Sequence, residues 1–523
     1  MQTRMFIALV GFLFLFPSFS NAQLPGLVSM EVEVMPGEEF EGRTYDHWPL
    51  MIANDGDHIY LSCVRIKAWA GERLNIEKRS ISTQETIWNV VVEEIEYDDL
   101  DLIYEESYYH EGDVHLIYRT EKDSDDSLYL LDRVITSEGD VMEPRVLAAS
   151  WIDDDDDPKT LRYNWNQALD GLSVIAVQMD DDEKTVLVRS TFNKALELES
   201  KTKYEFDFPF ESVRMIQSAF IDEKSYLFLA AEQEGRGVVG VLEMDTKGYR
   251  VVGAGVRHEN FRSIELHGAQ DGVHMSYLSF DEDDYDEITG YHSSILDFDS
   301  AGQVWVTDFE ITEEFREEME DYLGWFSSFP GSFSIKSFIP HPLGGYVVTL
   351  HRTHSVEDLR FGTINYYSYE YVAIYVDTSG QVQWSHHIPV RMGSITKEHL
   401  HNFIGFTDDA EYILMFPNDG SNVEGWNNGV RRAEDNSDAI TIARITPDGS
   451  KAYDNIFKIQ ERDIGLPMTT FHNMTPIEGA PGEFYMWQTL SRSDSRLVRV
   501  KFTGIDFSQP QPHEDVLHFG RER

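Results

Sequence analysis

The feature that most constrains the fold is a strand-like run that stops at a tight Asp/Gly turn and is followed by a second strand-like run. The pattern occurs in segments 242–248, 296–305, 374–384, 445–449 and, more loosely, 134–141. A turn rich in Asp and Gly between two such runs is typical of a β-hairpin. Hairpins that recur every several dozen residues are typical of a β-propeller or a related solenoid.

A second set of polar turns interleaves with the first and sets the expected number of units. Eight of these turns precede strand-like runs, at Asp55-Gly56, Glu111-Gly112, Asp170-Gly171, Asp222-Glu223, Asp271-Gly272, Gly344-Gly345, Asp408-Asp409 and 479–482. We therefore expect an all-β chain folded as a β-propeller with eight blades, with seven blades as the alternative. Each unit has roughly 60 residues, more than the roughly 40 to 50 that a four-stranded blade needs. The excess predicts long loops, and we expect the ring to close between the N-terminal residues and the last strands around Leu497–Phe507.

The spacing of the polar turns widens in the second half of the chain, which predicts loop insertions after about residue 310. In segment 312–326, Phe315, Met319, Tyr322 and Phe326 recur at helical spacing. This apolar stripe predicts a short helical insertion near 312–326 that packs against the body of the protein.

Residues 1–22 have the pattern of a signal peptide. Arg4 precedes an apolar run from Met5 to Phe16, and the segment ends in Ser20-Asn21-Ala22. The run is too short to span a bilayer, and no later stretch is apolar for long enough. We expect a signal peptide over 1–22 and a single β-propeller domain over 23–523, with no integral membrane segment. The mature protein is then exported and soluble, in a periplasm or outside the cell; the alternative is an N-terminal membrane anchor.

Composition narrows the partners and the source of stability. The chain has 93 acidic and 43 basic residues and a net charge of −50, which repels phosphate backbones and disfavours nucleic-acid binding. A hydrophobic fraction of 41% and an aromatic fraction of 13% indicate a folded chain despite this charge. Cys63 is the single cysteine, so no intrachain disulfide forms and core burial must provide the stability.

One turn connects the chain with known propeller repeats. The spacing of Asp377, Gly380 and Trp384 resembles the repeat turns of bacterial quinoprotein-like propellers and the Asp-box of sialidase-type propellers. The quinoprotein repeat has one more residue between Asp and Gly than this chain, and the Asp-box has one fewer. The resemblance implies a propeller over most of residues 45–510 and assigns no catalytic residue. It also implies that these Asp, Gly and Trp positions form blade corners and pack between blades.

Two groups of residues are candidates for ligand binding. Loop 416–429 combines Trp426 with the amides of Asn427 and Asn428, a mixture that suits stacking on sugars and bonding to their hydroxyl groups. The alternative is a turn-rich surface loop without a ligand. His399 and His401 are two residues apart, which on a strand places both on one face. Such a pair can bind a metal or transfer protons, but a buried histidine with satisfied hydrogen bonds is the alternative.

The acidic clusters 153–157, 180–183 and 281–287 offer oxygen ligands of the kind that Ca²⁺ prefers. None has the EF-hand pattern, and charge runs are normally solvated loops. We therefore expect no cofactor, with calcium as the alternative.

The chain shows no nucleophile elbow, no phosphate-binding loop and no dinucleotide-binding fingerprint. A glycosidase mechanism needs two carboxylates, but a chain with 93 acidic residues contains candidates by composition alone. The sequence favours an exported, non-catalytic binding scaffold that presents loops to a protein or glycan ligand. The alternative is a carbohydrate-active hydrolase or lyase on a propeller scaffold.

Overall fold

The computed structural model describes residues 31–41, 49–67, 71–83, 85–92, 96–97, 100–120, 127–151, 161–166, 170–179, 184–209, 213–233, 236–253, 261–269, 272–280, 288–313, 315, 332–358, 363–394, 403–428, 439–458, 471–477, 480, 482–489, 494–503 and 505–506. Within these ranges the chain is almost entirely β-strand, and every strand pair is antiparallel.

The strands of the described residues form eight sheets of four or five strands. The first four sheets along the chain contain β2 (Pro49–Asn54), β3 (His58–Lys67), β4 (Gly71–Ser80) and β5 (Thr86–Val92); β6 (Glu96–Tyr97), β7 (Leu100–His110), β8 (Asp113–Thr120), β9 (Ser127–Ile135) and β10 (Arg145–Trp151); β11 (Leu161–Trp165), β12 (Gly171–Met179), β13 (Lys184–Asn193) and β14 (Leu198–Pro209); and β15 (Val213–Ile221), β16 (Lys224–Gln233), β17 (Arg236–Asp245) and β18 (Gly248–Gly253).

The next three sheets contain β19 (Phe261–Ala269), β20 (Gly272–Phe280), β21 (Ile288–Asp297) and β22 (Gly302–Glu310); β23 (Ser332–Pro340), β24 (Tyr346–Asp358), β25 (Thr363–Val376) and β26 (Val382–Ser394); and β27 (Phe403–Thr407), β28 (Tyr412–Asn418), β29 (Ala439–Ile445), β30 (Lys451–Lys458) and β34 (Ile505–Asp506). The eighth contains β31 (Phe471–Pro476), β32 (Glu483–Thr489), β33 (Asp494–Thr503) and β1 (Glu31–Glu41).

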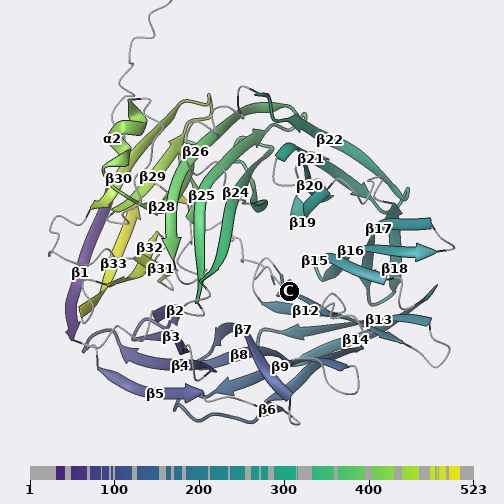
Figure 1. Ribbon diagram of the computed structural model, residues 1–523, viewed down its shortest axis with the longest axis horizontal. Coiled ribbons are helices and arrows are strands. Elements are labelled where there is room, and N and C mark those ends of the chain that lie inside the picture. Colours follow the sequence, from purple (N-terminus) through teal and green to yellow (C-terminus); the bar gives the residue numbers. More distant parts are fainter. Residues whose placement is uncertain are drawn as a thin grey trace, which may run out of the picture.

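The sheets are arranged as a ring around a central axis (Figure 1). Several contacts between neighbouring sheets join strands that come directly before a polar turn, namely β31 with β2, β2 with β7, β11 with β15, β15 with β19 and β19 with β23, while β10 contacts β12. We call the strands that come directly before the eight polar turns the inner strands, namely β2, β7, β11, β15, β19, β23, β27 and β31; the short strands β6 and β34 lie at the edge of a sheet beyond β7 and β27. Radial four-stranded antiparallel sheets around one axis define a β-propeller, so the predicted all-β propeller class is confirmed. The described sheets equal the eight repeat units in number, while the blade count itself stays a prediction.

The two ends of the chain meet in one sheet. β1 pairs antiparallel with β33, from Glu31 opposite Thr503 to Glu41 opposite Asp494. One outer strand from the N-terminal part thus completes three strands from the C-terminal part, which confirms the predicted closure. The short strand β34 adds a second link, because it pairs with the inner strand β27 of the preceding sheet.

The polar turns lie where the sequence placed them. Each of the eight turns predicted to open a unit lies between an inner strand and the next strand of the same sheet. Between third and fourth strands, Asp377 Oδ1 accepts the backbone N–H groups of Ser379 and Gln381, at 2.8 and 3.0 Å. The side-chain hydrogen bond from Ser379, together with these N–H bonds, lowers the pKa of Asp377. Aspartate therefore closes the turn by satisfying backbone donors that the strands leave unpaired.

Turns that lead into the outermost strand of a sheet also dock on the preceding sheet. The indole of Trp88 on β5 donates to Ser137 O at 2.9 Å, and a Cβ on Gly139 would lie 2.9 Å from this indole. Trp384 on β26 packs in the same way against Gly449 of the next sheet, where a Cβ would lie 3.1 Å from the tryptophan Cβ. Glycine is required because only a turn without a side chain allows this close approach. These contacts agree with the structural role that the propeller resemblance implies.

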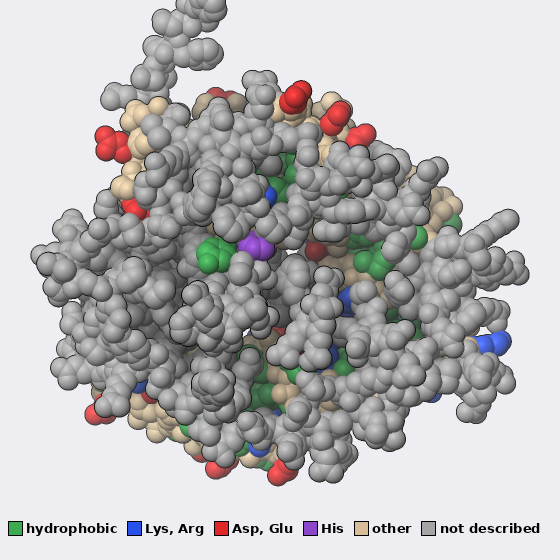
Figure 2. All heavy atoms as spheres, viewed as in Figure 1, with side chains coloured by type: hydrophobic (Ala, Val, Ile, Leu, Met, Phe, Trp, Pro, Cys, Tyr) green, Lys and Arg blue, Asp and Glu red, His purple; other side chains and the backbone are tan. Residues whose placement is uncertain are grey.

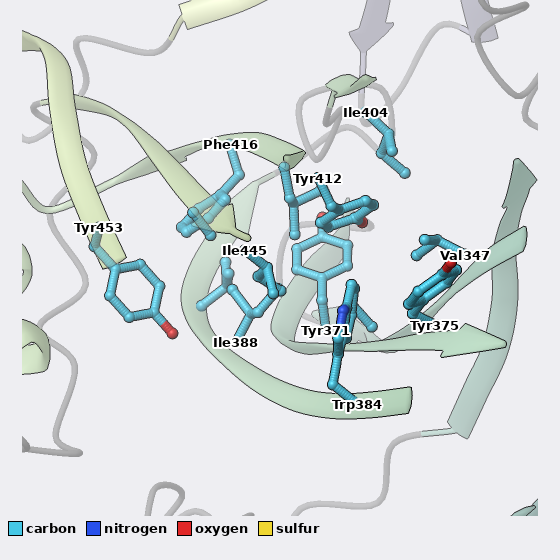
Figure 3. Close-up of a cluster of buried hydrophobic side chains, with 14 of the residues drawn as sticks. Val347, Tyr371, Tyr375, Trp384, Ile388, Ile404, Tyr412, Phe416, Ile445 and Tyr453 are labelled. Carbon is cyan, nitrogen blue, oxygen red and sulfur yellow. The ribbon is translucent and has the colours of Figure 1, made fainter. Parts of the chain in front are cut away.

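The core lies between the sheets. Its largest cluster joins the sheets β23–β26 and β27–β30 and contains Tyr371, Tyr375, Trp384, Tyr412 and Phe416 (Figure 3). Burial of such large aromatic side chains provides much of the stability in a chain without disulfides.

Several predictions of chain organisation fall wholly or partly outside the described residues. The signal peptide over 1–22 lies outside them, and the single domain over 23–523 stays a prediction. Of the insertion near 312–326, Glu313 and Phe315 are helical and the segment from 316 lies outside the described residues. The Phe315 side chain packs against the core between the sheets β19–β22 and β23–β26. No helix in the described part of the chain is long and apolar enough to cross a membrane.

Candidate binding surface of the central hollow

The innermost strands share an irregularity that directs side chains out of regular register. Six of them have a β-bulge, between Met51 and Ala53, Tyr104 and Glu106, Met215 and Gln217, Arg262 and Glu265, Ile335 and Ser337, and His472 and Met474. A bulge re-aims side chains and is common beside functional sites. The recurrence of the bulge on six inner strands indicates a candidate binding surface along these strands, around the axis of the ring.

Polar side chains of this wall bond across neighbouring inner strands. Trp165 Nε1 on β11 donates to Glu106 Oε1 on β7 at 2.9 Å. On the other side of β11, Arg162 donates to Met215 O on β15 at 3.1 Å, and the Ser218 hydroxyl bonds with Asn164.

The chain of bonds continues around the axis. Gln217 Nε2 on β15 donates to Glu265 Oε2 on β19 at 2.7 Å. Ser263 Oγ on β19 accepts the backbone N–H of Ile335 on β23 at 2.9 Å. Five consecutive inner strands are thus joined by side-chain hydrogen bonds. We call Glu106, Arg162, Asn164, Trp165, Gln217 and Glu265 the wall residues.

The molecule is hollowed at the centre of the face shown in Figure 2, where basic and hydrophobic side chains are visible inside the hollow. The wall residues supply two carboxylates, one guanidinium, two amides and one indole. These groups include donors and acceptors beside an aromatic ring, a combination that orients a polar ligand in a concave site.

The indole of Trp165 is held by a second aromatic ring. The Tyr108 ring lies 4.4 Å from it between centroids, and the Tyr108 hydroxyl donates to Lys194 O at 2.8 Å. Burial raises the pKa of Tyr108, so its phenol stays neutral and keeps donating. Trp165 is therefore fixed by one tilted aromatic contact and one hydrogen bond to Glu106.

A buried charged cluster lies next to this pair. Asp132 is fully buried and accepts from His115 Nδ1 at 3.0 Å and from Arg145 Nε at 2.9 Å. Arg145 also donates to Ala195 O in the turn of the next sheet, at 3.2 Å. The bonds of Asp132 link β8, β9 and β10 within one sheet, and the bond from Arg145 to Ala195 O joins this sheet to the next, so the cluster has a structural role.

The histidines between residues 341 and 401 are brought together in part. In the sheet β23–β26, the fully buried Glu370 pairs with Arg352 at 3.2 Å and with His387 at 2.8 Å. His351 Nε2 bonds with Ser368 Oγ at 2.7 Å. His399 and His401 lie outside the described residues, so their ligand role stays a prediction.

The loop residues singled out from the sequence have structural contacts. Trp426 lies in helix α2 (Asn422–Asn427), is buried, and packs 5.1 Å from the Tyr453 ring. Asn427 Nδ2 donates to Tyr453 O at 2.8 Å, while Asn427 Oδ1 accepts the Tyr453 N–H at 2.9 Å. Asn428 Nδ2 donates to Glu424 O at 2.8 Å. Ligand binding by these residues stays a prediction.

A substitution distinguishes a structural from a ligand-binding role for Asn427. We expect Asn427→Ala to lower the free energy of unfolding by about 1–3 kcal/mol, because both backbone groups of Tyr453 lose their partner. Chemical denaturation measures this change. The control is Asn428→Ala, whose amide makes one exposed bond and whose loss is expected to be smaller. Unchanged stability of Asn427→Ala would contradict the structural role.

No group of three or more His, Cys, Asp or Glu side chains that could hold a metal occurs within the described ranges. The acidic clusters 153–157, 180–183 and 281–287 lie outside those ranges. Calcium binding by the clusters therefore stays an untested alternative.

Sequence reasoning missed the wall residues. They lie in short strands of mixed polar and apolar residues, where they are indistinguishable from ordinary solvent-facing positions. Only their position along the chain could have identified them, because each lies on an inner strand, directly before one of the eight polar turns.

No family model and no curated protein matches the sequence. Solved structures with a similar fold include the WD40 domain of SCAP from fission yeast, with 10% identity, a TM-score of 0.35 and coverage of 91% of this chain and 95% of that chain. The β-propeller domain of the Trilobed protease from Pyrococcus furiosus has 9% identity, a TM-score of 0.32 and coverage of 82% and 99%. The polysaccharide lyase Uly1 has 9% identity, a TM-score of 0.31 and coverage of 91% and 100%.

These similarities concern the fold alone, and they include a lyase as well as non-enzymatic domains. The assignment to the β-propeller class therefore rests on the sheets themselves. Fold and wall together describe an all-β propeller with polar side chains around its central axis.

Proposed function

We propose that this protein is an exported, non-catalytic binding scaffold whose central hollow takes a polar protein segment or a glycan. The observation that supports the proposal is the band of wall residues on consecutive inner strands. A rigid ring holds these groups in place before a ligand arrives, which reduces the entropy lost on binding.

The hydrogen bonds of the wall favour binding over catalysis. A catalytic centre needs acids or bases with perturbed pKa values directed at one reacting atom. Here Glu106 accepts from the Trp165 indole and Glu265 accepts from the Gln217 amide, and both of these donors are neutral. Such groups suit recognition of hydroxyl and amide groups.

A matched pair of amide substitutions tests the location of the site. Arrays of soluble oligosaccharides and of peptides would first identify a binding probe. We expect Gln217→Ala on the inner strand β15 to weaken binding of that probe by roughly 10-fold, because a hydrogen bond to a charged group is lost from the wall. Titration calorimetry measures the dissociation constant.

The control is Gln383→Ala, which removes an exposed amide from the outer strand β26 and should leave the dissociation constant nearly unchanged. Equal effects of the two substitutions would place the site away from the hollow. Shortening of an oligosaccharide probe during incubation, followed by mass spectrometry, would instead support the hydrolase or lyase alternative.

A further inference from the structure

Two histidine rings hold the end of β23 that lies next to its polar turn. His267 on β19 stacks on Phe338 of β23, with centroids 4.6 Å apart and an interplanar angle of 8°. His341 follows β23 directly and stacks on Tyr375 of β25 at 4.2 Å. The His341 ring also meets Phe406 of β27 edge to face at 5.1 Å. One end of β23 is therefore tied to both neighbouring sheets through imidazoles.

The His341 ring must be neutral to make its contacts. His341 Nδ1 accepts the backbone N–H of Leu343 at 3.1 Å, and the side chain is buried. An imidazolium carries a hydrogen on both nitrogens and cannot accept this bond. Burial lowers the pKa of His341, and a hydrogen bond with the backbone of Ala410 opposes the shift.

The His267 ring must also be neutral, but for a different reason. Its Nε2 is shielded from solvent and has no hydrogen-bond partner among the described residues. A proton there would place an uncompensated charge between two sheets. Burial, followed by repulsion from His274, lowers the pKa of His267 to about 3.

The groups that face the two rings offer no compensating charge. Around His267 lie His274 of β20 and Phe338, and the Tyr346 ring of β24 packs against both of these. Around His341 lie Tyr375 and Phe406, and Asp377 acts on the phenol of Tyr375. No carboxylate of the described residues is hydrogen-bonded to either ring.

Some other buried histidines have such a partner, whereas the buried His274 and His351 bond with serine hydroxyl groups. His115 bonds with Asp132 and His387 pairs with Glu370, while the more exposed His58 bonds with Asp55. Opposite charge next to a ring compensates a proton on it, and the two rings beside β23 have no hydrogen-bonded carboxylate among the described residues.

We propose that β23 is an acid-sensitive joint, at which protonation of His267 and His341 in mild acid releases this strand from β19 and β27 before the other sheets separate. The device is independent of the proposed ligand. Opening at one sheet would change the inner wall locally while the rest of the ring keeps its structure.

The direction of the effect follows from the two protonation states. A histidine with a lower pKa in the closed form stabilises that form fully above about pH 6.5, the ordinary pKa of the open form. This stability is lost as the pH falls from about 6.5 towards 3. At about pH 5, His267 alone favours opening by about 30-fold relative to neutral pH.

Hydrogen exchange of the full chain tests the proposal. Protection of peptides covering 333–341 and 261–269 is measured at about pH 7.5 and about pH 5, each corrected for intrinsic exchange. We expect their protection to fall by roughly 10-fold or more in acid, while peptides of β8 and β9 keep theirs. A uniform loss over all sheets, or no loss in 333–341, would overturn the proposal without any variant.

Substitutions then assign the effect to the two rings. His267→Phe keeps an aromatic ring against Phe338, and His341→Asn keeps an acceptor for the Leu343 N–H, but neither residue titrates in this range. We expect peptides 333–341 and 261–269 of the double variant to keep their protection at about pH 5. In the control His58→Gln, the same peptides should lose protection as they do in the parent. Equal acid opening of the double variant and the parent would overturn the proposal.

Discussion

Replacing Gly380 with alanine is expected to lower the free energy of unfolding by about 3 kcal/mol or more. Gly380 has a φ of +80°, which costs an L-residue about 1–2 kcal/mol. A Cβ there would lie 2.0 Å from Val306 O on the neighbouring sheet. This contact forces the turn away from β22, and overpacking of that kind costs about 1–3 kcal/mol more. Chemical denaturation with a two-state fit measures the loss.

Two further glycines separate the causes. Gly56 has a φ of +89° but open space around its Cβ position, so Gly56→Ala should show the backbone cost alone. Gly253 has neither a positive φ nor a close neighbour, and Gly253→Ala should be nearly neutral. If Gly380→Ala costs no more than Gly56→Ala, the turn does not dock on the preceding sheet as described.

Replacing Glu370 with alanine is the second change with a large expected effect, a loss of about 3–5 kcal/mol in the free energy of unfolding. Glu370 is fully buried, and its carboxylate faces both Arg352 and His387. Removing the acid takes the Glu370 carboxylate away from a largely buried guanidinium and a buried imidazole. Glu370→Gln keeps the shape of the side chain and an acceptor, so its free energy of unfolding should fall by less than that of Glu370→Ala. Thermal and chemical denaturation at neutral pH provide the measurement.

An exposed ion pair is the matched control. Asp299 is 91% exposed and pairs with Arg250, and Asp299→Ala should change stability little, because water and salt screen such pairs. Similar losses at Glu370 and Asp299 would mean that burial of the first pair contributes nothing to stability.

The two predictions concern the sheet β23–β26 from different sides. Gly380 joins it to β22, and Glu370 stabilises its interior. The acid-sensitive joint lies on the same sheet, so loss of stability there should also make the joint open at higher pH. Measuring exchange of 333–341 in Glu370→Gln would connect the two effects.

Much of the fold could be predicted because propeller turns have local chemistry. Asp377 caps backbone N–H groups within four residues, and Gly380 provides a positive φ. Such requirements act over a few residues and therefore appear in the sequence. The turns at 81–85 and 193–197 were missed because they contain no glycine; in the second, Leu196 takes a φ of +55° and is buried instead.

The candidate site could not be predicted in the same way. Trp426 appeared as a ligand residue because Trp and Asn in a loop are also typical of binding loops, yet its ring packs in the core. The wall residues were missed because their bonds join strands some 50 residues apart, such as Gln217 to Glu265.

The amino-acid sequence by itself determined the all-β class, the order of the repeated hairpins and the way the ring closes, since alternation and turn chemistry depend on neighbours along the chain. Only the tertiary structure decided which polar side chains meet around the axis, and which histidines lack a carboxylate. Those pairings depend on how far each sheet is rotated against the next, and packing between sheets sets that rotation.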